Sequence, residues 1–329
     1  MKRFLFLLIF IPVFGFSQYT AIPDENFEKA LIKLGYDDNL FPDGKVPTYK
    51  IDKLKKLDIA FRDISDLTGI EAFSSLSELC CWDNQLTSID LSQNTALTFL
   101  NFDNNQLKSL DVSNNTALTY LSCWDNQLTS LDVSENTALT VLECFGNPLT
   151  SLDVSGCNSL SVLSCSKNQL TSLDVSNNTA LTYLRCSNNK LTTLDIGNNT
   201  DLTYLSCSNN PLTSLDVSNN TALIDLWCSN NQLKEIDVSK NIALTYLQCY
   251  KNQLKEIDVS ENTALIHLHC YKNQLTSLDV IGCTALTFLG CRKNKLTKLD
   301  LSGCTALERL YCDGNNFDCD ALKAKYNLK

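Results

Sequence analysis

The stretch "LTYLSCWDNQLTSLDVSENTA" at residues 118–138 decides the fold, because its pattern returns every 21 residues along most of the 329-residue chain. Written in lines of 21, the sequence from residue 76 to residue 316 gives the consensus L-x-x-L-x-C-x-x-N-x-L-x-x-L-D-V-S-x-N-T-A. A fixed period of this length is typical of a solenoid, in which each repeat packs only against its neighbours. We therefore expect a stack of twelve coils.

Each repeat contains two short apolar alternations. In "LTYLSC", Leu121 and Cys123 alternate with outward residues, which is the pattern of a strand with one buried face. The segment "LTSLDV" repeats this alternation ten residues later, at Leu131 and Val133. The many Thr, Ser, Asn and Asp residues disfavour a helix. The sequence therefore predicts a solenoid with two parallel strand ladders per coil, coils ~4.8 Å apart and a narrow apolar core between the ladders.

These repeats resemble the leucine-rich repeat family, and within it the bacterial class whose repeats are 21 residues long. The segment "LKKLDIAFRDISDLTGIEAFSSL" at residues 54–76 is similar to a 22-residue repeat of internalins, because Leu54, Leu57 and Ile59 occupy its L-x-x-L-x-C positions. The resemblance implies a non-enzymatic protein that binds another macromolecule on its strand-lined face.

Asparagine recurs in two columns of the repeat. In the first column, an inward amide can donate to and accept from the backbone of its own coil and the next, which predicts a structural role. This column comprises Asn84, Asn105, Asn126, Asn147, Asn168, Asn189, Asn210, Asn231, Asn252, Asn273, Asn294 and Asn315. The second column alternates between asparagine and cysteine, and cysteine stands at Cys157, Cys283 and Cys304.

Eleven of the sixteen cysteines occupy one column of the repeat, with Phe102 in the vacant step. A small residue that behaves as a hydrophobe fits beside the leucines. In-register strands hold equivalent Cβ atoms ~4.8 Å apart, beyond the ~3.5–4.5 Å that a disulfide needs, so we expect buried free thiols in this column. Cys80 is expected to point outward, and Cys319 either packs under the C-terminal end or pairs with Cys312.

The first residues have the pattern of a signal peptide. Lys2 and Arg3 precede an apolar run and small residues, which predicts a cleaved signal over residues 1–17. The apolar run is shorter than the ~20 residues that span a bilayer. We therefore expect a mature chain without membrane insertion, located in the periplasm, at the cell surface or in the medium.

Caps are expected at both ends, because a solenoid exposes its core there. Residues 18–50 are expected to form an N-terminal helical cap that begins after Asp24 and stops at Gly35. Its apolar face would comprise Phe27, Ala30, Leu31 and Leu34. The repeats would then occupy residues 51–316, and residues 317–329 would form a C-terminal helical cap in which Leu322 and Tyr326 cover the last coil.

Composition excludes several classes of function. The formal net charge of −10 argues against a nucleic-acid partner, because phosphate binding needs clustered Lys and Arg. The only histidines, His267 and His269, are expected to be exposed to solvent on an open strand ladder, which lacks the pocket and orienting partner that catalysis requires. We therefore expect no enzymatic activity, no metal and no cofactor.

Two acidic patterns also have structural interpretations. The aspartates of the L-D-V segments, from Asp90 to Asp300, are expected to be stabilised by nearby hydroxyls and amides and not to form a calcium ladder. The segment "DDNLFPDGK" at residues 37–45 is expected to be a turn, because it lacks the ligand order of an EF-hand.

The outward positions of the first strand carry the candidate ligand-binding residues. They are Trp82, Phe99, Tyr120, Trp124, Phe145, Tyr246, Tyr250, His267, His269, Tyr271 and Tyr311. Exposed aromatic residues in columns are unusual unless they form a binding surface. Acidic residues flank them near the N-terminal end, and Lys and Arg flank them near the C-terminal end. We expect a monomer that binds a protein, and the alternatives are a glycan ligand or a structural role at a surface or in a matrix.

Overall fold

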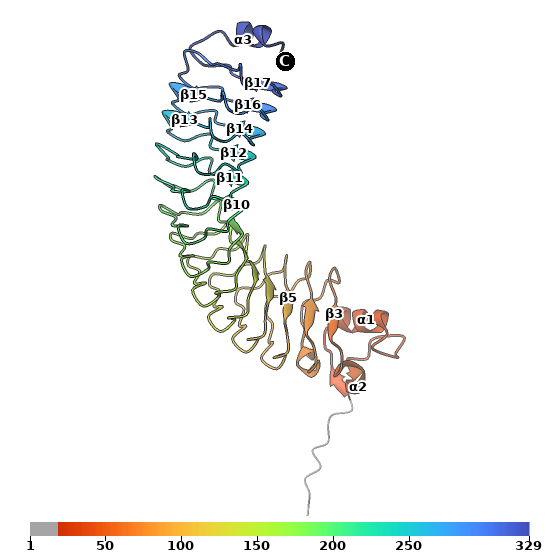
Figure 1. Cartoon of the computed structure of the whole chain (residues 1–329). Helices are drawn as coiled ribbons and strands as arrows, with labels where there is room; N and C mark the ends of the chain where they lie inside the picture. The colour runs from red at the N-terminus through yellow and green to blue at the C-terminus, as the bar shows by residue number, and fades with distance from the viewer. Residues whose placement is uncertain (1–18, 329) are drawn as a thin grey trace, which may run out of the picture.

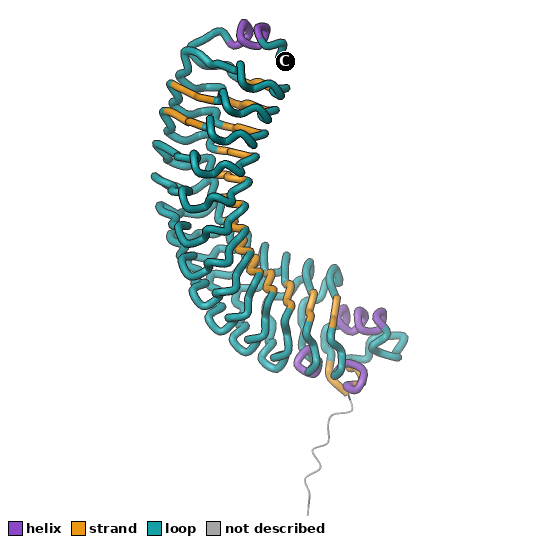
Figure 2. Tube along the Cα trace, in the orientation of Figure 1, coloured by secondary structure: helices purple, strands orange, loops and turns teal. Residues whose placement is uncertain are grey.

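The computed structural model describes residues 19–328, so the expected signal segment at residues 1–17 lies outside the described residues. The repeats stack into a curved solenoid, with α1 (Glu25–Leu34) near one end and α3 (Cys319–Lys325) at the other (Figure 1). Strands line the concave side of the arc, and loops form most of the convex side (Figure 2). None of the helices within residues 19–328 is long and apolar enough to cross a bilayer.

One parallel sheet of 13 strands runs the length of the arc. Its strands are β3 (Lys56–Asp58), β4 (Glu78–Cys80), β5 (Phe99–Asn101), β6 (Tyr120–Ser122), β7 (Val141–Glu143), β8 (Val162–Ser164), β9 (Tyr183–Arg185), β10 (Tyr204–Ser206), β11 (Asp225–Trp227), β12 (Tyr246–Gln248), β14 (His267–His269), β16 (Phe288–Gly290) and β17 (Arg309–Tyr311). The register pairs each central leucine with the leucine of the next coil, as in Leu100 with Leu121. This arrangement confirms the predicted solenoid and its first strand ladder.

The predicted second ladder is present only in part. On the convex side, only β13 (Glu256–Asp258) and β15 (Ser277–Asp279) pair as strands, and Asp132 and Asp153 form an isolated bridge. The cause is the curvature, because coils held at hydrogen-bonding distance on the concave side fan out on the convex side.

The core is a continuous column of leucine and cysteine. In the coil of β10, Leu202, Leu205 and Cys207 are each 0% exposed, and the other coils repeat this arrangement. Burial raises the pKa of the Cys207 thiol to about 12, so the thiol is protonated and unreactive at neutral pH. Free cysteines fill this column up to Cys291, which confirms the prediction of buried thiols. Cys80 is free and half-buried, consistent with its expected outward direction.

The side-chain amides of the first asparagine column both donate and accept hydrogen bonds. Asn189 donates from Nδ2 to the carbonyls of Cys165 and Cys186, at 3.0 Å each, and its Oδ1 accepts from the backbone of Leu170 at 3.0 Å. These bonds link neighbouring coils and satisfy backbone groups that no strand reaches. The predicted structural role is therefore confirmed.

The second asparagine column works as a donor alone. Asn178 donates from Nδ2 to the carbonyls of Val154 and Cys157 at 2.9 Å, while its Oδ1 is buried without a hydrogen-bond partner. A thiol can supply the donor function, and Cys157 Sγ contacts the carbonyls of Val133 and Asn136 at 3.7 Å. This difference explains why cysteine replaces asparagine in the second column and never in the first.

A matched pair of substitutions tests this distinction. We expect Asn189→Cys to lower the free energy of unfolding by about 2–3 kcal/mol, because the buried N–H of Leu170 loses its acceptor. Asn178→Cys should cost under about 1 kcal/mol, because the position needs only a donor. Urea denaturation followed by circular dichroism measures both. Equal costs would show that the acceptor is unimportant.

The N-terminal end is closed by α1. Asp24 accepts hydrogen bonds from the backbone of Asn26 and Phe27, and Gly35 ends the helix at φ 81°, a left-handed conformation that favours glycine. These two predictions are confirmed. The expected apolar face is buried except for Leu34, which is 40% exposed, so that prediction is wrong for Leu34. Four short elements complete this end of the chain. They are β1 (Tyr19–Ala21), which pairs with β2 (Lys45–Pro47), α2 (Thr48–Ile51) and a 3₁₀ turn at Ile70–Ala72.

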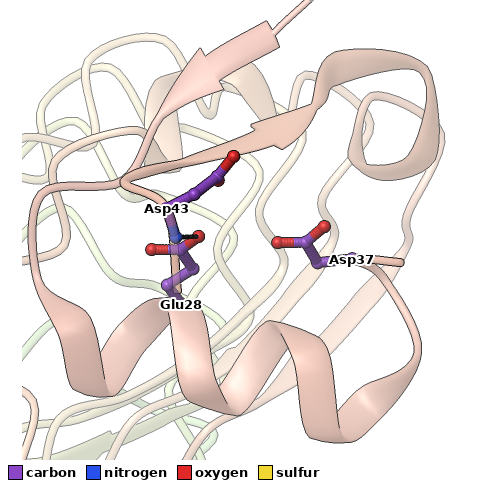
Figure 3. A group of neighbouring side chains, drawn as sticks. All are labelled: Glu28, Asp37 and Asp43. Atoms are coloured by element: carbon purple, nitrogen blue, oxygen red, sulfur yellow. Dashed lines mark hydrogen bonds between the residues drawn. The ribbon is translucent and has the colours of Figure 1, made fainter. Parts of the chain in front are cut away.

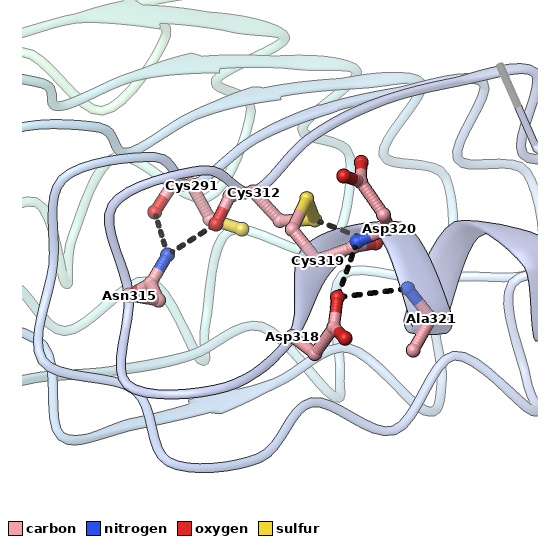
Figure 4. Close-up of a disulfide and its surroundings, with 7 residues drawn as sticks. All are labelled: Cys291, Cys312, Asn315, Asp318, Cys319, Asp320 and Ala321. Carbon is pink, nitrogen blue, oxygen red and sulfur yellow. Dashed lines mark hydrogen bonds between the residues drawn. A yellow bond between two sulfur atoms is a disulfide. The ribbon is translucent and has the colours of Figure 1, made fainter.

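At the C-terminal end, α3 is fastened to the last coil. Cys319, its first residue, forms a disulfide with Cys312, which confirms one of the two arrangements expected for Cys319 (Figure 4). Asp318 caps the helix by accepting from the backbone of Asp320 and Ala321, at 3.0 Å each. Leu322 and Tyr326 pack partly buried against the end of the core, as predicted.

Candidate functional site: the concave face

The concave face consists of the residues that point outward from the 13-stranded sheet, at three positions in each coil. In the coil of β6 these positions are Tyr120, Ser122 and Trp124, which alternate with the buried Leu121 and Cys123. Ten of the eleven expected ligand-binding residues are half-buried here, and only Tyr311 is classed as exposed, at 44%. The rings are partly covered because they pack against one another.

Near the N-terminus the expected aromatic residues form separate pairs. Phe99 stacks on Tyr120, with ring centroids 4.4 Å apart, and Trp124 meets Phe145 edge to face at 6.4 Å. Trp82 packs edge to face at 4.0 Å against Phe61, which was not among the expected residues. Phe61 lies in the 22-residue repeat, where the 21-residue pattern gives no indication that it faces outward.

Hydrogen bonds to acidic residues connect these pairs. The Tyr120 hydroxyl donates to Glu143 at 2.8 Å, the Ser122 hydroxyl donates to Asp103 at 2.5 Å, and the backbone of Trp124 donates to Asp103 at 3.0 Å. Burial raises the pKa of Asp103 to about 6, although these hydrogen bonds oppose the increase. The N-terminal half of the concave face therefore holds a carboxyl group that titrates near neutral pH.

The raised pKa of Asp103 predicts a specific pH dependence of stability. The folded state holds the proton more tightly than the unfolded state, so this contribution is complete below pH ~4 and is lost as the pH rises through about 6. A shift of about two units corresponds to ~3 kcal/mol, and partial solvent access reduces our expectation to ~1–2 kcal/mol. Asp103→Asn cannot titrate and should become more stable relative to the parent between pH 4.5 and 7. Urea midpoints at both pH values measure this, and parallel pH profiles would contradict it.

Towards the C-terminus the aromatic residues form one continuous run across seven strands. Neighbouring rings lie 4.4–5.9 Å apart in the sequence Tyr183, Tyr204, Trp227, Tyr246, His267, Phe288 and Tyr311. In a parallel row, Tyr250 stacks on Tyr271 at 4.3 Å. The expected set omitted four residues of this run, Tyr183, Tyr204, Trp227 and Phe288. All four stand at outward positions of their strands, and this was the signal that could have identified them.

The two histidines belong to this run. His269 is half-buried and its Nε2 lies 3.2 Å from the Tyr246 hydroxyl, and burial lowers the pKa of His269 to about 4. The expectation of solvent-exposed rings is therefore wrong, because both imidazoles pack among neighbouring aromatic rings. Among residues 19–328, no group of three potential metal-ligating side chains includes either histidine.

Charge is polarised along the edge of the concave face. One position in each coil has a left-handed backbone, with Asp83 and Asp125 near the N-terminus at φ 55° and 49°. Lys251, Lys272 and Lys293 take this position in three consecutive coils, at φ 55–57°. A left-handed conformation is less favourable for lysine than for asparagine, aspartate or glycine. Lys167 also takes this position, at φ 52°, so lysine occurs here in the middle of the solenoid as well as in the C-terminal coils.

A hollow lies on the convex side of the solenoid. Its volume is about 1220 Å³, and its lining includes Asp258, Asp279, Lys298 and Lys325. The aspartates belong to the L-D-V segments, and each already accepts a backbone hydrogen bond two residues ahead, as Asp258 does from Ser260 at 2.9 Å. Such bonds occur along the column and confirm the expected local stabilisation. These carboxylates therefore already accept hydrogen bonds from the backbone of their own turns.

Comparison with known proteins gives structural relatives only. No family model and no curated protein sequence matches the chain. Among solved structures, the chain is similar to the functional domain of InlJ from Listeria monocytogenes, described as including a cysteine ladder, with 38% identity over 91% of this chain and 72% of that chain and a TM-score of 0.76. It is also similar to the internalin InlF of the same species, with 23% identity over 91% and 96% of the two chains and a TM-score of 0.72. The plant peptide hormone receptor RGFR1 in complex with RGF2 shares the fold, with 23% identity, 83% and 53% coverage and a TM-score of 0.68.

Proposed function

This chain belongs to the bacterial internalin-like leucine-rich repeat proteins, and from that membership we propose that it is an exported, non-enzymatic protein that binds another protein on its concave face. The observation that carries the proposal is the aromatic run from Tyr183 to Tyr311. It crosses seven strands, which is roughly 29 Å at ~4.8 Å per strand. A surface of this length suits a protein partner, and aromatic anchors contribute much of the free energy at such interfaces.

Ring geometry favours a protein over a glycan. A sugar ring needs a free aromatic face, but many rings here stack face to face with their neighbours. The interplanar angles are 10° for Phe99 with Tyr120, 14° for Tyr183 with Tyr204 and 7° for Tyr250 with Tyr271. This stacking covers the ring faces that a sugar would need, whereas a protein interface can use ring edges as well as faces.

The distribution of charge adds detail to the proposed partner. Because Asp83 and Asp125 flank one half and Lys251 and Lys272 flank the other, we infer a partner with a basic patch facing the N-terminal coils and an acidic patch facing the C-terminal coils.

Capture from extracellular material tests the proposal. Purified chain without residues 1–17 is immobilised and incubated with the secreted and surface proteins of the producing cells and of cells they encounter, and a glycan array is probed in parallel. We expect one protein to be retained by the parent and lost with the charge-reversed variant Lys251→Glu/Lys272→Glu. Binding to the array alone would favour the glycan alternative. Assembly into a regular polymer without retention of another protein would favour a structural role.

A further inference from the structure

Three carboxylates meet in the N-terminal part of the chain, away from the concave face. Glu28 projects from α1, Asp37 lies just after the helix, and Asp43 lies just before β2 (Figure 3). One oxygen from each side chain lies within 4.8 Å of the others. The turn predicted for residues 37–45 thus closes over a residue of the preceding helix.

Glu28 is held rigidly at the base of this cluster. It is 1% exposed, and its two carboxylate oxygens accept hydrogen bonds from the backbone of Asp43 at 2.7 Å and Gly44 at 2.8 Å. Gly44 has φ 80°, a left-handed conformation that permits this turn. Each Glu28 oxygen accepts one bond in this way and retains capacity for a second.

Asp37 is the side chain that the protein leaves unsatisfied. It is 5% exposed, and its Oδ1 accepts from the backbone of Asn39 at 3.2 Å. Its Oδ2 is buried without a hydrogen-bond partner, and Figure 3 shows the carboxylate directed towards Glu28 and Asp43. A buried carboxylate oxygen in this state is costly unless a positive charge or a proton compensates it.

The neighbouring cations do not supply that charge. Among residues 19–328, the ion pairs of this region are Lys45 with Asp43 Oδ2 at 3.6 Å and Lys50 with Asp38. Neither lysine pairs with Glu28 or Asp37. The buried carboxylates of Glu28 and Asp37 therefore face each other beside the exposed Asp43, and no lysine side chain of the described residues lies between them as a counter-charge.

We propose that Glu28, Asp37 and Asp43 bind a calcium ion. Calcium takes 6–8 oxygen ligands at ~2.3–2.6 Å, so oxygens on opposite sides of one ion lie ~4.6–5.2 Å apart, and the observed separations of up to 4.8 Å fit without rearrangement. Magnesium would require a closer set, at most ~4.2 Å across. Water and backbone carbonyls would complete the coordination. The ion would link α1 to the loop at residues 37–44 and rigidify this end of the solenoid.

Isothermal titration calorimetry on chelator-treated chain lacking residues 1–17 tests the proposal. The parent is expected to bind one calcium ion, and Asp37→Asn is expected to weaken the affinity roughly tenfold or more while preserving the side-chain shape. Asp38→Asn is the matched control, because it removes the same charge from the adjacent exposed residue, which lies outside the cluster. This control should bind calcium like the parent.

A second variant tests whether weaker binding results from loss of folding. Asp43 is exposed, so Asp43→Asn should leave the circular dichroism spectrum unchanged and still weaken binding. Calcium should raise the melting temperature of the parent and of Asp38→Asn, and should raise it less in Asp37→Asn. The proposal is overturned if the parent binds no calcium at millimolar concentration. Equal affinity in the parent and Asp37→Asn would also overturn it, because the ion would then bind elsewhere.

Discussion

Replacing Trp82 and Trp124 together by alanine is expected to weaken binding of the captured protein roughly a thousandfold. Aromatic anchors buried by a partner contribute ~2 kcal/mol or more each, and about 4 kcal/mol corresponds to three powers of ten in affinity. Both residues are half-buried on the concave face, where later coils have serine at the same position, as at Ser187 and Ser208. Their aromatic character is therefore local and is not required by the repeat.

The fold should tolerate this change. Trp82 loses its edge-to-face contact with Phe61, and Trp124 loses its contact with Phe145, so we expect a stability cost of about 1 kcal/mol for each substitution. Tyr49→Ala is the matched control, because Tyr49 is 68% exposed in α2, outside the concave face. Surface plasmon resonance measures the affinities. If the double variant binds as tightly as the parent, the N-terminal aromatic residues are not the site, and Tyr250→Ala/Tyr271→Ala becomes the decisive variant.

The second large effect concerns the core. Leu205→Ala is expected to lower the free energy of unfolding by about 3–5 kcal/mol, because Leu205 is 0% exposed at the centre of β10 and the coils on both sides prevent collapse of the cavity. Cys207→Ala, at the neighbouring 0%-exposed position, should cost only about 1–2 kcal/mol, because a smaller group is removed. Urea denaturation compares the two variants.

Thiol counting provides the complementary check on the cysteine column. Denatured, non-reduced protein should expose the fourteen free thiols that accompany the Cys312–Cys319 disulfide. Recovery of mostly disulfide-bonded cysteine would contradict the view that these residues fill the core as small hydrophobic groups.

The period of the sequence was sufficient to predict the solenoid, since the alternation at Leu121 and Cys123 and the 21-residue repeat together specify a stacked strand with one buried face. The second ladder was mispredicted because the alternation at Leu131 and Val133 reports burial but not spacing between coils. Both residues are buried, as expected, but the only pairing that the structure describes there is an isolated bridge between Asp132 and Asp153. Curvature depends on the packing of whole coils and cannot be read from one repeat.

The sequence predicted which residues of the candidate surface point outward, but not which of them contact one another. The sequence indicates that Trp124 and Tyr246 point outward, whereas the ring pairings depend on side-chain rotamers and on neighbours in adjacent coils. The acidic cluster was missed because a linear motif search of residues 37–45 cannot include Glu28, which lies in the preceding helix.

The functional proposal depends on one surface, so the most direct measurement is hydroxyl-radical footprinting of the chain with and without the captured protein, since this method reports solvent access at individual aromatic side chains. We predict that binding protects Trp82, Trp124, Tyr250 and Tyr271 on the concave face. Reactivity at Phe41 and Tyr49, which are 80% and 68% exposed outside that face, should not change. Protection of Phe41 and Tyr49 with full reactivity on the concave face would contradict the proposal that the aromatic surface of the sheet is the binding site.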